Sequence, residues 1–403
     1  MNVKRYRWFC GIDVAKNKHV ACIMDRDGRI VARSQSFYNN AEGYQVLLKR
    51  IKETCASDRP LIGMEATGHY WYALHDFLVE HGYDVVVINP LQTKQQAKKG
   101  IRKSKTDKID ARHIATLIKN GEHRAALVPD DFAMTCRQLS RLRARQVQHI
   151  SRLKTLLWSR VTPIWPEYET LFAEPFRTTG RKLLLAAPTP SDVLALEPEQ
   201  LDELVRKASR GKFGPVKVEQ IRQAAARTIG IRRGLKGARI GIRSIITQIE
   251  ALMPIRSQLE EHIDALADQL PAYYFTLPGI TRIGAVSLFG ETDPITAFQA
   301  PGQLVAFAGL DTNAFQTGQC TGERLQRRIT KRGSPFLRHT LWRMAHRACY
   351  QEGDLRDYWL RRKREGLHHL AAVTATALKL CHVVWRILTD QRDYQPQPPT
   401  KNA

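Results

Sequence analysis

Short apolar runs alternate with helical patterns over the first 125 residues of the chain. Short apolar runs bounded by turn residues favour strands, whereas apolar residues at every third or fourth position are typical of amphipathic helices. Asp27-Gly28 separates the second and third runs and predicts a tight hairpin turn. The predicted strands are 7–14, 19–25, 29–37, 61–64 and 84–88, and the predicted helices are 41–54, 70–81, 91–99 and 107–120. This order predicts a mixed α/β sheet with helices on its faces.

The middle of the chain is predicted to be helical, with one long, arginine-rich helix over 131–160. From Ile242 onward, apolar residues keep a 3–4 spacing for about four heptads, broken only at Arg256, which predicts a coiled-coil seam. This seam either joins two copies of the chain or folds back on the chain's own 131–160 helix. Pro254 lies inside the seam, and we expect it to kink or split the helix.

A third, mainly helical unit is predicted from Pro271 onward. Its segment Leu277-Pro278-Gly279-Ile280 resembles the hairpin of a helix-hairpin-helix element, whose backbone N–H groups bind a phosphate. Ordinary packing of a Pro-Gly turn before a helix is the alternative. We therefore expect domains at 1–125, 126–270 and 271–390, followed by a disordered, proline-rich tail at 391–403.

The strongly positive net charge of the chain indicates a polyanionic partner, which the pattern of elements alone does not. Its 63 Lys and Arg against 39 Asp and Glu give a net charge of +24 and a pI near 10.0. The excess is concentrated in residues 94–124 and 324–364. Because each neutralised phosphate releases counterions, such clusters favour nucleic acid. A basic surface that binds nothing specific is the alternative.

Seven cysteines are scattered along the chain without any Cys-x-x-Cys pair. This spacing argues against a zinc ribbon and against a disulfide framework, and it fits a reducing compartment. No apolar segment of the sequence approaches the length of a membrane span, and the start of the sequence has no signal-peptide core, so we expect a cytoplasmic protein without a membrane partner.

Four carboxylates in the first 110 residues are candidates for metal ligands. Asp13 ends the apolar run Phe9-Cys10-Gly11-Ile12, and Glu65 ends a second apolar run. Charge at the end of a buried strand is costly unless it is neutralised. Asp107 and Asp110 are three residues apart and share one face of a predicted helix. Such a set can hold two hard divalent cations, and the order of elements is the one expected of an RNase H-like fold.

These residues and several C-terminal motifs together resemble the insertion-sequence 110 family of DEDD transposases, which also includes the Piv DNA invertase. The resemblance spans roughly residues 8–385 in the same order. The matching motifs are Gly11-Ile12-Asp13-Val14-Ala15-Lys16, Glu65-Ala66-Thr67-Gly68, Asn89-Pro90, Lys105-Thr106-Asp107-x-x-Asp110-Ala111-Arg112, Leu277-Pro278-Gly279-Ile280, Phe307-Ala308-Gly309-Leu310 and Lys331-Arg332-Gly333-Ser334-Pro335-x-Leu337-Arg338.

The resemblance implies an RNase H-like (RuvC-like) first domain that binds two Mg2+ ions, with Mn2+ as a substitute, through the four carboxylates. It implies a C-terminal transposase domain whose catalytic serine attacks a DNA phosphate and forms a covalent protein–DNA intermediate. Members of the family are guided by a structured noncoding RNA, the bridge RNA, which pairs with donor and target DNA. The expected partners are therefore double-stranded DNA, this guide RNA and further copies of the chain, in a dimer or tetramer.

The chain departs from the family pattern at the serine. The matching segment reads Phe315-Gln316-Thr317-Gly318, so the hydroxyl belongs to Thr317. A threonine can act as a nucleophile when it is activated, but its extra methyl group restricts χ1. Three interpretations stay open: Thr317 is the nucleophile, Ser334 replaces it, or this copy is impaired. Pro335 follows Ser334, so the pattern favours Ser334 as a helix N-cap.

Basic residues near the candidate catalytic groups are the predicted nucleic-acid contacts. The predicted set is Lys103, Lys105, Arg112, Gly279, Arg327, Arg328, Lys331, Arg332 and Arg338. Tyr350, Tyr358 and Trp359 alternate with basic residues and either stack on bases or pack in the core.

We therefore predict an RNA-guided DNA transposase or recombinase that cuts and rejoins DNA through Thr317 and the four carboxylates. A Holliday-junction resolvase that uses metal-activated water is the first alternative, and it needs no C-terminal hydroxyl. An actin-like ATPase or sugar kinase shares the Gly-Ile-Asp of the first strand but needs glycine-rich phosphate loops that the chain lacks. A nucleic-acid-binding protein with an inactive centre is the third alternative.

Overall fold

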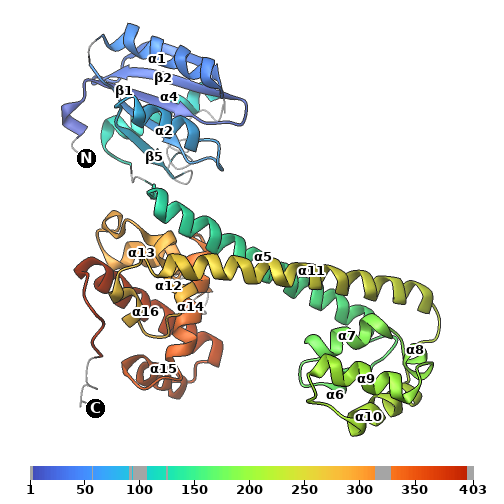
Figure 1. The fold of residues 1–403 in the computed structure, drawn as a ribbon. Coiled ribbons are helices and arrows are strands. Elements are labelled where there is room, and N and C mark those ends of the chain that lie inside the picture. Colours follow the sequence, from blue (N-terminus) through green and yellow to red (C-terminus); the bar gives the residue numbers. More distant parts are fainter. Residues whose placement is uncertain are drawn as a thin grey trace, which may run out of the picture. The chain divides into compact units, whose positions relative to one another are not determined.

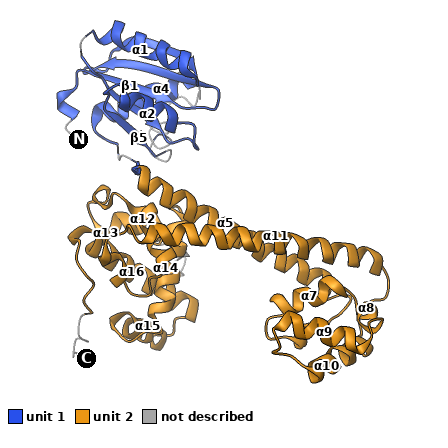
Figure 2. Ribbon diagram, in the orientation of Figure 1, with its two compact units in different colours: residues 1–130 blue, residues 131–403 orange. Residues whose placement is uncertain are grey.

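The computed structural model describes residues 3–56, 58–89, 93, 107–123, 126–313 and 328–396. The chain divides into two compact units, residues 1–130 and residues 131–403 (Figure 2). The predicted border at 125 lies five residues before this division. The second predicted border, at 270, lies inside unit 2.

Unit 1 is built on a five-stranded sheet with the order β3-β2-β1-β4-β5. The strands β1, β2 and β3 pair antiparallel, whereas β4 is parallel to β1 and β5 is parallel to β4. The mixed sheet predicted from the sequence is therefore confirmed. The strands are β1 (Trp8–Asp13), β2 (Lys18–Asp25), β3 (Ile30–Tyr38), β4 (Leu61–Glu65) and β5 (Val85–Ile88), and a short 3-10 helix, η1 (Val3–Arg5), precedes them.

Helices cover both faces of this sheet. The helices α1 (Ala41–Cys55) and α2 (Tyr72–Glu80) pack on the face that carries Cys10 and Ile12 of β1. The helix α4 (Asp107–Asn120) packs on the opposite face, which carries Phe9 of the same strand. Successive residues of a strand point to opposite faces, so β1 contributes to both cores. The predicted helix 91–99 lies outside the described residues except for Thr93.

Gly11 of β1 allows α4 to lie directly on the sheet. A Cβ atom at Gly11 would meet the Ala111 carbonyl oxygen at 2.2 Å and the Ala115 nitrogen at 2.3 Å. Only a residue without a side chain permits this approach of helix backbone to strand backbone. Gly11 therefore sets the distance between α4 and the strand that ends at Asp13.

Unit 2 is organised along two long helices, α5 (Asp131–Val161) and α11 (Leu235–Ala267), which lie side by side (Figure 1). Ile242, Ile245 and Ile249 of α11 share one hydrophobic core with Leu153 and Leu157 of α5. The predicted apolar seam is therefore buried within the chain, which supports the folded-back alternative over a seam between two copies. The helix α11 runs through Pro254 without being split, contrary to one half of our expectation.

Two groups of helices occupy the two ends of this pair (Figure 1). The first group consists of α6 (Tyr168–Leu171), α7 (Thr178–Ala186), α8 (Pro190–Leu194), α9 (Pro198–Ser209) and α10 (Pro215–Ala226). The second group consists of η2 (Ala272–Thr276), α12 (Arg282–Thr292), η3 (Ile295–Ala297), α13 (Pro301–Ala308), β6 (Thr312–Asn313), β7 (Arg328–Ile329), α14 (Pro335–Ala348), α15 (Asp354–Arg364) and α16 (His369–Asp390).

The helix α16 corrects the statement that no segment has the length of a membrane span. Among the described residues it is the one helix long and apolar enough to cross a membrane, by length and composition only. It packs against α13, α14 and α15, and its Trp385 indole donates to the Phe298 carbonyl oxygen at 2.7 Å. These contacts are those of a core helix.

Two further expectations concern the tail and the cysteines. The first residues of the predicted disordered tail are held in place: the Tyr394 hydroxyl donates to Asp354, and its backbone N–H donates to Thr276 Oγ1 at 2.8 Å. Residues 397–403 lie outside the described part. All six described cysteines are buried and free, as expected for a chain without a disulfide framework.

Candidate functional site

Asp13 and Glu65 stand at the same edge of the sheet in unit 1. The strands β1 and β4 are parallel neighbours, and their register pairs Ile12 with Met64. The next residue on each strand is the carboxylate, so both side chains lie at the carboxyl ends of adjacent strands. Both residues are partly exposed, whereas the strand residues before them are buried.

The first turn of α4 lies at this same edge. Near the other end of α4, Lys119 Nζ lies 3.3 Å from the position of a Cβ atom on Gly28. Gly28 belongs to the hairpin turn beside Asp25, which pairs with Trp8 at the start of β1. The helix therefore runs opposite to β1, and its first turn, with Asp107 and Asp110, lies toward the end where β1 stops at Asp13.

Two hydroxyl groups orient the Glu65 carboxylate. Thr93 donates to Oε2 at 2.7 Å, and Thr67 donates to Oε1 at 3.4 Å. Thr67 belongs to the Glu-Ala-Thr-Gly motif of the sequence, whereas the role of Thr93, which is buried, was not predicted. Both hydroxyls leave lone pairs of the carboxylate available to a cation.

The carboxylates suit a hard cation by chemistry, because Mg2+ and Mn2+ prefer oxygen ligands. In the described residues, however, no three His, Cys, Asp or Glu side chains lie close enough together to hold a metal ion. The structure thus places the four predicted ligands toward one edge of unit 1. Among the described residues it does not place three of them close enough together to bind one metal ion.

Among the predicted nucleic-acid contacts of unit 1, Arg112 is exposed on α4, five residues after Asp107 and two after Asp110. Lys103 and Lys105 lie outside the described residues.

In unit 2 a short ladder closes the base of the segment that carries Thr317. The strand β6 pairs antiparallel with β7, with Thr312 opposite Ile329 and Asn313 opposite Arg328. In the sequence, Thr317 and Arg327 fall between these two strands, and both lie outside the described residues. The Thr330 hydroxyl donates to Asp311, and the Thr330 N–H donates to the Asp311 carbonyl oxygen at 2.8 Å. The two ends of the segment are therefore fixed next to each other.

The glycines of two sequence motifs bring this ladder against α13. A Cβ atom on Gly333 would meet the Phe307 carbonyl oxygen at 1.9 Å, and Gly309 adopts a positive φ of 66° at the end of α13. The Lys331 N–H donates to the Gly309 carbonyl oxygen at 3.1 Å. Lys331 and Arg332 are exposed here, beside the base of the Thr317 segment, where cations could meet a phosphate.

Ser334 is the N-cap of α14, as the sequence predicted. Its Oγ accepts from the Leu337 N–H at 3.2 Å and donates to Glu291 Oε2 at 2.8 Å. Both contacts hold the hydroxyl in a structural role. Glu291 in turn receives two hydrogen bonds from Arg141 of α5, at 2.6 and 2.9 Å.

Sequence reasoning missed Glu291 and Arg141. Glu291 is fully buried in α12, and it links α5 to the N-cap of α14. The available signal was an acidic residue that directly follows the mostly apolar stretch Ala285–Gly290, since a buried carboxylate requires a partner. Arg141 was one of many arginines in α5, and nothing in the sequence singles it out.

Two predicted nucleic-acid contacts have packing roles in the structure. Gly279 has a positive φ of 69°, and a Cβ atom there would meet the Met344 carbonyl oxygen of α14 at 2.1 Å. Arg338 donates from Nη1 to the Ala308 carbonyl oxygen at 2.9 Å, and burial lowers the pKa of its guanidinium. A phosphate-binding role for either residue stays a prediction.

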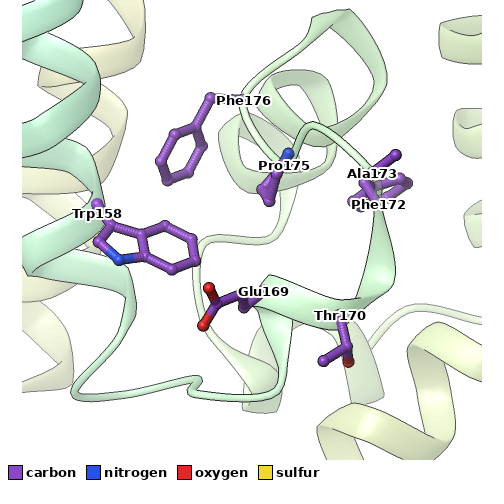
Figure 3. A pocket seen from close by; sticks show the side chains of 7 residues that line it. All are labelled: Trp158, Glu169, Thr170, Phe172, Ala173, Pro175 and Phe176. Carbon is purple, nitrogen blue, oxygen red and sulfur yellow. The ribbon is translucent and has the colours of Figure 1, made fainter. Parts of the chain in front are cut away.

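A hollow of about 590 Å³ lies between α5, α6 and residues 172–176 (Figure 3). Trp158 and Phe176 face each other edge to face across it, with Glu169 nearby. None of the predicted site residues lines this hollow.

Comparison with known families defines the chain as a transposase. A transposase model of the DEDD type, named for IS110, matches residues 10–166, and a model described as transposase IS116/IS110/IS902 family matches residues 274–360. These matches contain the carboxylate edge and the ladder of β6 and β7, respectively. The chain belongs to the IS110 family of transposases.

Similar proteins agree with this assignment. The chain is 24% identical to the insertion element IS116 uncharacterized 44.8 kDa protein of Streptomyces clavuligerus, over 99% of each chain. It is 22% identical to the transposase for insertion sequence element IS1111A of Coxiella burnetii, over 96% of this chain and 90% of that one. It is also 36% identical to the pilin gene-inverting protein of Moraxella bovis over 105 residues, which is 26% of this chain and 31% of that one.

Proposed function

We propose that the chain is an RNA-guided DNA recombinase that uses the carboxylates of unit 1 and the Thr317 hydroxyl of unit 2. The observation that carries the proposal is the placement of Asp13 and Glu65 at the ends of adjacent parallel strands, with the first turn of α4 at the same edge. Charges placed at the ends of buried strands are costly unless they neutralise a cation or a partner.

The strand order supports an RNase H-like (RuvC-like) fold for unit 1. The supporting observations are three antiparallel strands followed by two parallel ones, in the order β3-β2-β1-β4-β5, with helices on both faces. In this interpretation the carboxyl edge of β1 and β4 is the catalytic edge.

Asp13, Glu65, Asp107 and Asp110 would hold two Mg2+ ions, with Mn2+ as a substitute. When bound, such ions reduce the charge repulsion at a scissile phosphate and stabilise the leaving oxygen.

The covalent step assigned to Thr317 is a transesterification. The hydroxyl oxygen forms a bond to the DNA phosphorus, the bond from phosphorus to one DNA oxygen breaks, and the proton passes to solvent or to the leaving oxygen. The product is a protein–DNA phosphodiester and a free DNA hydroxyl end. Lys331 and Arg332, exposed beside the base of the segment, would neutralise the phosphate during this step.

The partners follow from the family resemblance. A bridge RNA would read donor and target DNA by base pairing, and the protein would bind both duplexes and the RNA in the cytoplasm. A dimer or tetramer would allow the carboxylates of one protomer to work with Thr317 of another. Because the α11 seam is used within the chain, contacts between copies would have to come from other surfaces.

Denaturing electrophoresis of labelled donor DNA, incubated with protein, guide RNA and Mg2+, tests the proposal. We expect a labelled band at the mass of the protein plus DNA, which persists in Thr317→Ser and disappears in Thr317→Val. Free cut ends without any adduct would contradict the covalent step and favour the metal-activated water of a junction resolvase. A large loss of adduct in Thr317→Ser would contradict the role of Thr317.

A further inference from the structure

The helices α14, α15 and α16 meet in unit 2 (Figure 1). Five aromatic rings gather at this junction. Trp342, His346 and Tyr350 follow one another at spacings of four residues, with ring centroids 5.3 and 5.4 Å apart. Trp359 of α15 and His369 of α16 complete the group, with centroids 5.8 Å apart. The spacing of four residues places the first three rings in one row along the helix.

Tyr350 is the exposed end of this row. Its side chain is 61% exposed, whereas Trp359 beside it is only 8% exposed. The Tyr350 ring nevertheless has ring neighbours on two sides, His346 at 5.4 Å and Trp359 at 5.7 Å. A ring already held by its neighbours loses little conformational freedom when a ligand stacks on it. Tyr350 therefore offers a preorganised aromatic face to solvent.

Cations flank the row of rings. Arg343 and Arg347 are exposed, and each follows a ring residue in sequence, so they form a second row beside the first. In the described part of the chain, neither arginine takes part in an ion pair. Lys363 Nζ lies 4.9 Å from the centre of the Trp359 ring. The carboxylate of Glu365 forms ion pairs with Arg361 and Arg362.

We propose that this surface binds an unpaired stretch of nucleic acid, with a base stacked on Tyr350 and phosphates beside Arg343 and Arg347. Every base has a π-face, so stacking tolerates any sequence, but a duplex hides these faces between its base pairs. The surface would therefore distinguish unpaired from paired strands. This goes beyond the proposed recombination chemistry, which requires DNA and RNA but assigns no surface to unpaired bases.

The three aromatic residues that the sequence singled out thus have different roles. Trp359 packs in the core and supports the surface, and Tyr358 lies between the cations Arg361 and Lys379. Tyr350 is the one whose ring is open to a base.

Fluorescence anisotropy of the full chain with labelled oligonucleotides tests the inference. The probes are a single strand of DNA of about 20 nucleotides, an RNA strand of the same sequence, and the corresponding DNA duplex. We expect Tyr350→Ala to weaken single-strand binding roughly 5- to 100-fold and to leave duplex binding unchanged. If only the affinity for the DNA strand falls, the surface binds unpaired DNA, and if only the affinity for the RNA strand falls, it binds unpaired RNA. If both affinities fall, it accepts both kinds of strand.

Further variants separate stacking from packing. Tyr350→Trp keeps an aromatic face and should retain single-strand binding, whereas Tyr350→Leu keeps apolar volume without a π-face and should lose it. Tyr38→Ala is the matched control, because Tyr38 is 57% exposed on β3 of unit 1 and also has a cation, Lys18, over its ring at 4.6 Å. It should bind like the wild type.

Two results would overturn the inference. The first is wild-type affinity for single strands in both Tyr350→Ala and Tyr350→Leu. The second is an equal loss for single strands and duplex, which would mean that Tyr350 acts only by supporting the fold of this surface. Because the readout is binding and not strand transfer, neither result depends on the role of Thr317.

Discussion

Arg141 and Glu291 form a bidentate ion pair that joins the first long helix of unit 2 to α12. The two hydrogen bonds measure 2.6 and 2.9 Å, and Glu291 is inaccessible to solvent while Arg141 is 35% exposed. Glu291 also accepts from Ser334, the N-cap of α14, which follows the ladder of β6 and β7. The pair therefore supports the part of the fold from which the Thr317 segment departs.

Glu291→Gln should destabilise unit 2, because it leaves the Arg141 charge without a carboxylate in a mostly buried setting. We expect a loss of about 2–3 kcal/mol in the free energy of unfolding, below the full cost for a buried pair since Arg141 retains contact with water. Urea unfolding measures this loss. The control Glu174→Gln removes an exposed pair with Arg177 and should cost less than about 1 kcal/mol. Equal losses in the two variants would contradict the assignment.

Ser334→Ala distinguishes a structural hydroxyl from a nucleophile. The variant loses the N-cap bond to Leu337 and the bond to Glu291, so we expect about 1–2 kcal/mol of destabilisation. It should still form the covalent protein–DNA adduct on a denaturing gel. A folded Ser334→Ala protein that forms no adduct would instead make Ser334 the nucleophile.

Gly11→Ala should separate α4 from the sheet, because the new Cβ atom would lie 2.2 Å from the Ala111 carbonyl oxygen. The clash is with backbone atoms, which cannot move aside as a flexible side chain can. We therefore expect the free energy of unfolding to fall by about 3 kcal/mol or more, and strand transfer to be lost. Thermal unfolding and a strand-transfer assay measure the two effects. Gly241→Ala in α11 meets no atom within 4 Å and should stabilise the protein by about 0.5–1 kcal/mol.

Unit 1 should lose stability below neutral pH through His19. Burial lowers the pKa of this imidazole from its ordinary value of 6.5, although a hydrogen bond with Asn39 opposes the shift. The Ala15 N–H donates to its Nδ1 at 3.3 Å, which requires the neutral ring. As the pH falls through 6.5, the unfolded chain gains a proton that the folded chain does not.

The expected loss attributable to His19 begins near the unfolded pKa and grows as the pH falls further below it. Thermal unfolding at several pH values between neutrality and mild acid measures it. His19→Gln keeps an acceptor for Ala15 and cannot titrate in this range, so its unfolding temperature should fall less steeply with acid. An identical pH profile for the two proteins would refute the role of His19.

The sheet of unit 1 was predictable from the sequence because its strands are short apolar runs between clear turn signals. Asp27-Gly28 marks the first hairpin, and each predicted strand and described helix of this unit agrees with the structure to within two residues. The strand-end positions of Asp13 and Glu65 were readable for the same reason. Their common edge follows once β1 and β4 are known to be parallel neighbours.

The partner of the α11 seam was not predictable, since an apolar stripe does not reveal whether another helix of the same chain or a second copy covers it. The same limit applies to Gly279, whose Pro-Gly turn fits a phosphate-binding hairpin and a close contact with α14 equally well by sequence. Glu291 was missed because its partners, Arg141 and Ser334, are 150 and 43 residues away along the chain.

Strand transfer by Asp13→Ala tests the central claim most directly. The assay measures joined DNA product and, in parallel, binding of the proposed guide RNA. Asp76→Ala is the control, because Asp76 is an exposed carboxylate on α2. We predict no joined product and near-normal RNA binding for Asp13→Ala, and normal activity for Asp76→Ala. Full strand transfer by Asp13→Ala would contradict the claim that these carboxylates form the catalytic edge.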